Sequence, residues 1–303
     1  RIMTYRIQRL APNPIIHPGL DPSIGTNING PSLVPAPSWL PCPLGRYYLY
    51  FAHHSGTTIR LAFADHLQGP WRIYSPGTLA LGQTPCRGHI ASPDVHIDTA
   101  RKTVRMYFHG PTPHGQVSFL AESRDGLDFK VISEPLGPFY FRVFQYAGFY
   151  YAIAKILNRP GGGIVLRSRD GKTPFEPGPD ILPRQRHVAV HRNTDQLDIF
   201  LSRGEDMPES ILHATLDLTG DWTRWKPSEP ALLAKPETDR EGARLPLTRS
   251  SFGPARTPVH ELRDPAFFEE NGIPYLLYSV AGESGIAIAR LIPVNHEETP
   301  CAH

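Results

Sequence analysis

The stretch Leu262 to Arg290, LRDPAFFEENGIPYLLYSVAGESGIAIAR, decides the expected fold because it reads as three short strands joined by two tight turns. We expect the strands at 266–268, 275–279 and 286–289. Asn271-Gly272, between the first two, tolerates the positive φ that a hairpin turn needs. A meander of this kind cannot bury both of its faces alone. The stretch therefore predicts further copies of itself elsewhere in the chain.

Upstream segments repeat the same order of strand, turn, aromatic strand, loop and strand. Arg124-Asp125-Gly126 and Arg169-Asp170-Gly171 fill the same charged turn in two of the copies. Meanders repeated at a spacing of roughly 45 to 75 residues are typical of a β-propeller. We therefore predict an all-β, five-bladed propeller that forms a single domain over residues 1–303. Its blades are expected at approximately 27–75, 90–132, 138–177, 185–226 and 261–291.

The N-terminal segment supplies a strand that the last copy lacks. Residues 4–10, TYRIQRL, alternate like a strand, whereas the copy at 261–291 has only three clear strands. We expect this N-terminal strand to join the last blade as its outermost strand and so to close the ring, because an open ring leaves sheet edges unpaired. The alternative is a loose N-terminal arm. The long irregular connection 229–260 is expected to form a lid or rim over a site.

Composition excludes several classes of protein. The chain has 303 residues, 40% of them hydrophobic, and a net charge of +2, which does not suggest a nucleic-acid partner. No apolar run is long enough to span a membrane. The cysteines, Cys42, Cys86 and Cys301, follow no metal or disulfide spacing and favour a cytoplasmic protein. The sequence begins at Arg1, so secretion or periplasmic export after signal cleavage stays open. The oligomeric state is left undetermined.

Propeller geometry then predicts which residues share one mouth of the central channel. The first strand of each blade leaves that mouth and the second strand returns to it. Strand starts and the loops after second strands should therefore meet there. The polar residues at these positions are Asn27, Asn29, Ser92, Asp94, Arg142, His187, Arg263 and Asp264 from strand starts, and His53, His54, His109, His114, Lys155, Arg203, Glu205, Glu209 and Glu283 from the returning ends and loops.

Several of these segments resemble the five-bladed propeller glycosidases, the superfamily that includes glycoside hydrolase families 43, 32 and 117. Ala91-Ser92-Pro93-Asp94-Val95 is similar to the family-43 motif Trp-Ala-Pro-Asp-Val, and Arg263-Asp264-Pro265 to an Arg-Asp-Pro strand opening. Tyr47 to Phe51 and Gly69-Pro70-Trp71 look like the second-strand and Gly-Pro-Trp signatures of those enzymes. The resemblance covers nearly the whole chain and implies a carbohydrate-active enzyme with an oligosaccharide or glycoside as substrate.

The chain departs from this superfamily at the carboxylates. Asn29 stands where an acidic general base is usual, and an amide cannot accept a proton at neutral pH. Residues 140–142 and Arg186 or His187 stand where further acidic residues are expected. The pair of carboxylates that hydrolysis ordinarily uses is therefore not found at the expected places. Three alternatives stay open: other carboxylates catalyse the hydrolysis, the protein catalyses a different reaction, or catalytic activity is lost.

We accordingly name as catalytic candidates Asp94, Glu205, Glu209 and His187. The substrate-binding candidates are Asn29, His53, His54, His109, Arg142, Lys155, Arg203, Asp264 and Glu283. Each has a structural alternative: a buried Asp can hold backbone amides, a loop Glu can be merely solvated, and Asp264 can form an ion pair with Arg263. Histidine can serve as acid or base near neutral pH. No cofactor or metal ligand is predicted, since no ligand motif of short spacing occurs, although a divalent ion in the channel is an open possibility.

Three functions are compatible with these residues. The first is an exo-acting glycoside hydrolase, with an oligosaccharide that carries a uronic acid as one option, because Arg and Lys bind carboxylates. The second is a lyase that uses His or Tyr as base and a cation to neutralise a uronate. The third is a non-catalytic sugar-binding propeller, which the missing carboxylates would favour.

Overall fold

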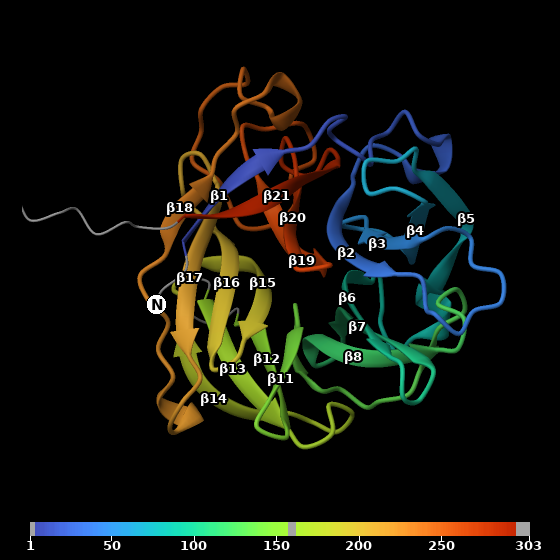
Figure 1. Ribbon diagram of the computed structural model, residues 1–303, viewed down its shortest axis with the longest axis vertical. Coiled ribbons are helices and arrows are strands. Elements are labelled where there is room, and N and C mark those ends of the chain that lie inside the picture. The colour runs from blue at the N-terminus through green and yellow to red at the C-terminus, as the bar shows by residue number, and fades with distance from the viewer. Residues whose placement is uncertain (1–3, 157–161, 295–303) are drawn as a thin grey trace, which may run out of the picture.

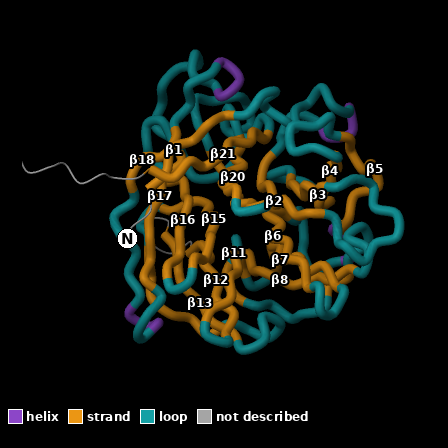
Figure 2. The backbone as a smooth tube through the Cα atoms, viewed as in Figure 1, coloured by secondary structure: helices purple, strands orange, loops and turns teal. Residues whose placement is uncertain are grey.

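The protein is a ring of five antiparallel sheets in the computed structural model, which describes residues 4–156 and 162–294. The sheets stand around a central axis (Figure 1). Nearly all regular structure is strand (Figure 2), and in the described ranges the only helices are four short 3-10 turns. The predicted all-β, five-bladed propeller is confirmed.

The strands of each sheet follow one another in the chain. Blade one holds β2 (Asn29–Pro35), β3 (Tyr47–Ala52), β4 (Thr58–Ala64) and β5 (Arg72–Ala80). Blade two holds β6 (Ala91–Asp98), β7 (Thr103–Thr112), β8 (Gly115–Ser123), β9 (Lys130–Val131) and β10 (Gly137–Pro138). Blade three holds β11 (Arg142–Tyr146), β12 (Phe149–Ile156), β13 (Gly162–Ser168) and β14 (Glu176–Ile181).

The remaining strands form the two blades that complete the ring. Blade four holds β15 (Gln185–Asn193), β16 (Gln196–Arg203), β17 (Ile211–Asp217) and β18 (Ala231–Ala234). Blade five holds β19 (Arg263–Glu270), β20 (Ile273–Ser279), β21 (Ile286–Val294) and the N-terminal β1 (Thr4–Arg9). The 3-10 turns are η1 (Pro22–Ile24), η2 (Leu81–Gln83), η3 (Trp222–Arg224) and η4 (Asp239–Glu241).

The N-terminal strand closes the ring as predicted. β1 pairs antiparallel with β21 from Thr4↔Val294 to Arg9↔Ala289, so that the first and last parts of the chain lie side by side (Figure 1). Tyr5 and Ile7 of β1 pack against the hydrophobic cluster between blades four and five. This pairing gives the edge of β21 a partner, which protects it from association with other chains.

The core is divided into clusters between neighbouring blades, and β3 shows how one strand serves two of them. Successive side chains of a strand point to opposite faces. Tyr47, Leu49 and Phe51 accordingly pack toward blade five, whereas Tyr48 and Tyr50 pack toward blade two. Both faces of β3 are buried, which explains why the strand reads as an unbroken aromatic and aliphatic run.

The repeated Arg-Asp-Gly turns link each blade to the preceding one. The hydroxyl of Tyr50 in blade one donates a hydrogen bond of 2.6 Å to the carbonyl of Gly126, and Tyr107 in blade two donates one of 2.8 Å to that of Gly171. Both glycines have positive φ, 75° and 69°, and a Cβ on either would stand within 2.9 Å of the tyrosine hydroxyl. The glycine of this turn is therefore required by backbone conformation and by close approach together.

The inner strands of three blades share an irregular register near their first residues, beside the candidate site. In β2, β6 and β19 two residues face one on the neighbouring strand, which makes a β-bulge. The bulged pairs are Gly30-Pro31, Ser92-Pro93 and Asp264-Pro265, and the first residue of each has a φ between 49° and 60°. A bulge leaves one residue without ladder partners, which suits proline because it lacks an N–H. Bulges re-aim side chains, and here they lie at one mouth of the channel.

Two further observations concern the predictions from composition. Over the described ranges, no helix has the length and apolar character needed to cross a bilayer. Cys42 is exposed and Cys86 is buried, both as free thiols, while Cys301 lies outside the described residues.

Candidate active site

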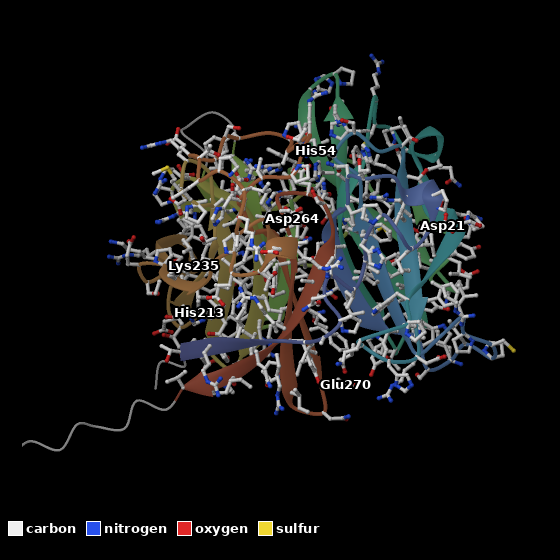
Figure 3. All side chains as sticks on the ribbon, turned by 90° about the horizontal axis from the view of Figure 1, so that it is seen from above. Asp21, His54, His213, Lys235, Asp264 and Glu270 are labelled. Atoms are coloured by element: carbon white, nitrogen blue, oxygen red, sulfur yellow. The ribbon has the colours of Figure 1, made fainter. Side chains whose placement is uncertain are left out.

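One mouth of the channel opens into a cavity of about 660 Å³. In side view His54 lies near this face and Asp264 deeper, whereas Glu270 at the other end of β19 lies toward the opposite face (Figure 3). Residues from all five blades line the cavity, so distant parts of the chain meet there as expected for a propeller. The predicted site residues in its wall are Asn29, His54, His109, Lys155, His187, Glu205, Asp264 and Glu283.

Asp94 and Arg142 lie deeper in the channel, around a separate cavity of about 160 Å³. Asp94 comes two residues after the bulged Ser92, so the residue equivalent to Asp264 in blade two is Ser92. The carboxylate of Asp94 accepts hydrogen bonds from the backbone N–H of Val143 and from Nε2 of His96. Burial alone would raise its pKa, but His96, Arg142 and the Val143 N–H outweigh this and hold the pKa below its usual range.

Arg142 is bonded to the inner strands of two neighbouring blades. Its guanidinium donates to the carbonyls of Val188, at 3.0 Å, and Pro93, at 3.1 Å. These carbonyls belong to the blades on either side of blade three. The arginine therefore joins three inner strands and lines the smaller cavity, whereas its place in the sequence predicted the wall of the main one.

Glu209, Arg203 and His53 also stand outside the cavity wall. Glu209 is fully buried behind the wall, accepts a hydrogen bond from Ser202 and pairs with Arg186 at 3.1 Å. Arg203 pairs with Asp206 at 3.1 Å. The ring of His53 accepts a hydrogen bond from the N–H of Ser55, in its own turn. Of the histidine pair, only His54 lines the cavity.

His187 and Asp264 form a buried pair at the cavity wall. Nδ1 of His187 lies 2.5 Å from Oδ1 of Asp264, whose other oxygen accepts hydrogen bonds from the Gly30 N–H and the Ser279 hydroxyl. Burial alone would raise the pKa of Asp264, but His187 and nearby arginines lower it overall. Burial lowers the pKa of His187 to about 4, against the opposing effect of Asp264. At neutral pH Asp264 is therefore ionised and His187 neutral. With Nδ1 beside the carboxylate, Nε2 is the ring nitrogen that can accept a proton from the cavity side.

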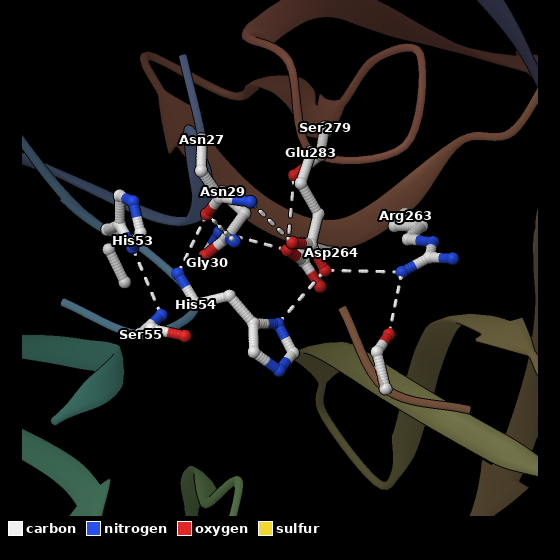
Figure 4. A network of polar contacts seen from close by, with 12 residues as sticks. Asn27, Asn29, Gly30, His53, His54, Ser55, Arg263, Asp264, Ser279 and Glu283 are labelled. Atoms are coloured by element: carbon white, nitrogen blue, oxygen red, sulfur yellow. Dashed lines mark hydrogen bonds and ion pairs between the residues drawn. The ribbon is translucent and has the colours of Figure 1, made fainter. Parts of the chain in front are cut away.

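His54 and Glu283 form a second pair in the same wall (Figure 4). Nδ1 of His54 lies 3.1 Å from Oε1 of Glu283, and Nδ2 of Asn27 donates to the other oxygen at 2.8 Å. Arg263 also reaches Oε1, at 3.2 Å. Burial would raise the pKa of Glu283, but the bonds from His54 and Asn27 lower it overall. With Nδ1 directed to the carboxylate, Nε2 on the other side of the ring is available to a ligand.

Lys155 is the cation of this wall that lacks a counter-ion. Its side chain is 7% exposed, and its ammonium lies 5.5 Å, 5.6 Å and 5.2 Å from the ring centres of Phe139, Tyr140 and Phe252. Within the described part of the chain it has neither a hydrogen-bond acceptor nor a carboxylate partner. Burial, followed by the charge of Arg186, lowers its pKa to about 8. The rings stabilise the ammonium through cation–π attraction, but they supply no full negative charge.

A row of rings connects the basic groups across the cavity. Tyr140 lies between His109 and His187, with ring centres 4.4 Å and 4.5 Å away, and has a φ of 63°. Burial and Asp264 raise the pKa of Tyr140, so its phenol stays protonated. Burial also lowers the pKa of His109 far below its usual value, and to a lesser degree that of His89. Over the described ranges, no group of three or more His, Cys, Asp or Glu side chains is arranged to hold a metal ion.

Several cavity residues were not predicted as site residues. Among those with polar or large side chains are His89, Gln116, Arg186 and Phe252. His89, Arg186 and Phe252 come from places the blade pattern does not describe: the link between blades, an extra residue in the bulge of β15, and the long connection before β19. The length of that connection was the one available signal, since it predicted a rim over a site.

Comparison with known proteins shows which families and structures the chain is similar to. No profile of a known protein family matches it. A curated protein, the uncharacterized protein R118 of Acanthamoeba polyphaga mimivirus, is 39% identical, with 88% of this chain and 83% of that protein covered.

Solved structures are similar in fold at low sequence identity. A putative glycosidase from Bacteroides thetaiotaomicron superposes with a TM-score of 0.69 at 13% identity, covering 94% of this chain and 96% of the other. A thermostable family-43 glycoside hydrolase superposes with a TM-score of 0.63 at 14% identity, covering 90% and 91%. The predicted resemblance is therefore confirmed at the level of the fold. The chain belongs to the same family as the mimivirus protein R118 and shares the five-bladed propeller fold of family-43 glycoside hydrolases.

Proposed function

We propose that the protein is a carbohydrate-active enzyme that hydrolyses a glycosidic bond in the central cavity. The observation that carries the proposal is the presence of two histidine–carboxylate pairs, His187 with Asp264 and His54 with Glu283, in the wall of one cavity. Each pair combines a group able to move a proton with a carboxylate that orients it. Hydrolysis of a glycosidic bond needs one proton donor and one proton acceptor on opposite sides of the bond.

The two pairs divide the proton transfers between them in this proposal. Nε2 of His187 removes a proton from the attacking water, and the bond between that water oxygen and the anomeric carbon forms. The bond from the anomeric carbon to the leaving oxygen breaks, and the leaving oxygen takes the Nε2 proton of a His54 imidazolium, whose Nδ1 proton stays with Glu283. Ionised Asp264 stabilises the imidazolium that forms on His187. Glu205, at the exposed rim of the cavity, is the remaining candidate donor among the predicted carboxylates. The scheme needs no cofactor.

The substrate proposed is the end of an oligosaccharide, or a glycoside, that carries a uronic acid. Support comes from Lys155, which lacks a counter-ion that a sugar carboxylate would supply. A cavity enclosed by five blades favours a chain end over the middle of a polymer, which is the basis for an exo-acting enzyme.

A lyase is the second candidate, and one observation favours it. The buried carboxylates of the wall, Asp264 and Glu283, both have lowered pKa values and so offer no carboxylic acid to protonate a leaving group. Elimination beside a uronate needs a neutral base and a cation on the carboxylate, and His187 and Lys155 match these roles.

A panel of oligosaccharides and aryl glycosides, neutral and uronic, tests these functions. Products are followed by NMR and by ultraviolet absorbance, because elimination creates a conjugated double bond and hydrolysis does not. Cleavage without new absorbance, abolished in His187→Ala, supports the hydrolase. Cleavage with new absorbance supports the lyase. Binding without turnover of any sugar supports the non-catalytic alternative and contradicts the proposal.

A further inference from the structure

The wall segment, residues 250–253, closes one side of the cavity although it belongs to no blade. It lies in the long connection between β18 and β19, and its Phe252 and Gly253 line the cavity. Two backbone hydrogen bonds tie Ser250 to the loop after β16: the N–H of Glu205 donates to its carbonyl at 3.2 Å, and its own N–H donates to the carbonyl of Asp206 at 3.0 Å.

Two buried arginines hold the rest of the segment from beneath. Arg186 donates to the carbonyl of Ser251 at 2.6 Å and to that of Gly253 at 2.8 Å. Arg263 also donates to the carbonyl of Gly253, at 3.1 Å. Each arginine is 2% exposed, so removal of the segment would strand buried N–H groups without acceptors, which is unfavourable. The segment is therefore a fixed wall, in contrast to a lid that opens.

Glu209 links the two arginines. Its carboxylate lies 3.1 Å from Nε of Arg186 and 3.7 Å from Nε of Arg263, and it has no exposed surface. A planar guanidinium that is held on one edge by a carboxylate presents its other N–H groups in a fixed direction. Here that direction is toward the carbonyls of the wall segment.

These contacts place the ring of Phe252 with little freedom. A Cβ on Gly204 would stand 2.5 Å from the ring, so the ring rests directly on the backbone at that glycine. Phe252 is nevertheless 39% exposed, and the ammonium of Lys155 lies 5.2 Å from the centre of its ring. A large apolar ring held open beside a cation without a counter-ion offers a sugar both an apolar surface and a charge.

We propose that Phe252 is the platform on which the bound sugar ring stacks, and that Arg186, Arg263 and Glu209 are its positioning residues. The inference rests on the proposed function, because it takes the ligand to be a sugar. The C–H face of the ring lies against Phe252, while a carboxylate on the same sugar reaches Lys155. Phe252 then determines which sugars bind, and the histidine pairs act on the bond that this stacking places before them.

Substitutions at Phe252 test the platform directly. With the substrate that is cleaved best in the panel, we expect Phe252→Ala to raise KM about tenfold, equivalent to about 1.4 kcal/mol, with kcat changed less than about twofold, because the sugar loses the apolar surface on which it stacks. Phe252→Trp should keep or lower KM. Leu247→Ala is the matched control, since Leu247 is an exposed apolar residue of the same connection and lies outside the cavity. Unchanged KM in Phe252→Ala overturns the platform.

A binding experiment separates this inference from the proposed function. Tryptophan fluorescence of Phe252→Trp is titrated with methyl glucuronide, methyl galacturonide and methyl glucoside, with the wild-type protein as background. A saturable change with a uronide, even where no panel sugar is turned over, supports the platform and leaves only the catalytic proposal contradicted. No change with any of the three sugars overturns the platform, whether or not turnover occurs.

The positioning role has its own readout. In Phe252→Trp carrying Arg186→Lys or Glu209→Gln, we expect the emission of the free protein to shift to longer wavelength and the uronide to bind about three- to tenfold more weakly, because a lysine cannot reach both carbonyls. Thermal unfolding curves identify any variant that fails to fold. A folded Arg186→Lys variant with unchanged emission and affinity overturns the positioning role.

Discussion

Replacement of Asp264 by Asn probes the pair on which the proposed chemistry depends. Asp264 is an acceptor only, so it fixes the proton of His187 on Nδ1 and leaves Nε2 as the base. An Asn amide in the same place can donate to Nδ1, which moves the ring proton to Nε2 and removes the base from the cavity side. The side-chain volume is unchanged, and the carbonyl oxygen can still accept from Gly30 and Ser279.

The size of the effect follows from these contacts. General base catalysis contributes about 10²–10⁴-fold, and reversal of the tautomer in hydrolytic triads lowers kcat by about 10⁴-fold. We expect kcat to fall by about 10³-fold, equivalent to about 4 kcal/mol in the transition state. The hydrogen bonds from Gly30 and Ser279 then go to a neutral acceptor in place of a charged one, which lowers the free energy of unfolding by about 2 kcal/mol at most. The variant should therefore be folded and almost inactive.

The assay is kcat and kcat/KM on the best panel substrate, with thermal unfolding measured on the same samples. In the wild type, kcat/KM should rise with pH up to about 4, where His187 loses its proton. In the variant this rise of kcat/KM with pH should be absent, because Nε2 of His187 no longer acts as a base. Asp264 stabilises the fold above its unfolded pKa, and this contribution is lost only as pH falls through its lowered folded pKa. Asp94→Asn, the same chemical change outside the cavity, should keep kcat within a few fold. A folded Asp264→Asn variant with more than about a tenth of wild-type kcat would refute the reasoning.

Three further predictions concern the cavity and the ring. The KM for a uronic substrate should rise above pH 8, where Lys155 loses its charge, while the KM for a neutral one stays flat; Lys155→Met should remove the difference between the two substrates. Gly126→Ala should lower stability by about 1–3 kcal/mol in denaturant unfolding, because its Cβ would stand 2.9 Å from the hydroxyl of Tyr50 and its φ is 75°. Deletion of residues 1–10 should lower Tm and cause aggregation in light scattering, because β21 loses its partner; a monomeric variant of unchanged Tm would contradict ring closure.

The fold could be predicted from the sequence because its signals are local and repeated. The aromatic run of β3 and the Asn271-Gly272 turn each follow from strand periodicity and turn chemistry within a few residues. Closure by β1 could also be predicted, because the copy at 261–291 lacked a strand and one unpaired strand was available. These inferences need no knowledge of side-chain contacts.

The site could be predicted only in part, because bulges shift which residue faces the cavity. The Pro of Ser92-Pro93-Asp94 marks a bulge that turns Ser92 to the wall, and Asp94 then falls one layer deeper. A count along the strand that omits this extra residue places the carboxylate of Asp94 in the wall of the main cavity, too close to the mouth of the channel. The same effect in β15 brings Arg186 into the wall beside His187.

Contacts between distant segments were beyond prediction from the sequence. Whether Glu209 faces a ligand or a buried arginine depends on the packing of Arg186 and Arg263 behind the wall, and no spacing in the chain records that packing. Phe252 lies on a connection without periodicity, so its place follows only from the carbonyls that the arginines hold.

A crystal structure of Asp264→Asn with the best panel oligosaccharide bound tests the central claim most directly. The account predicts a sugar in the 660 Å³ cavity. Its glycosidic oxygen should lie within hydrogen-bond reach of Nε2 of His54, and the attacking water within reach of Nε2 of His187. A sugar bound on another surface, with this cavity holding only solvent, would contradict it.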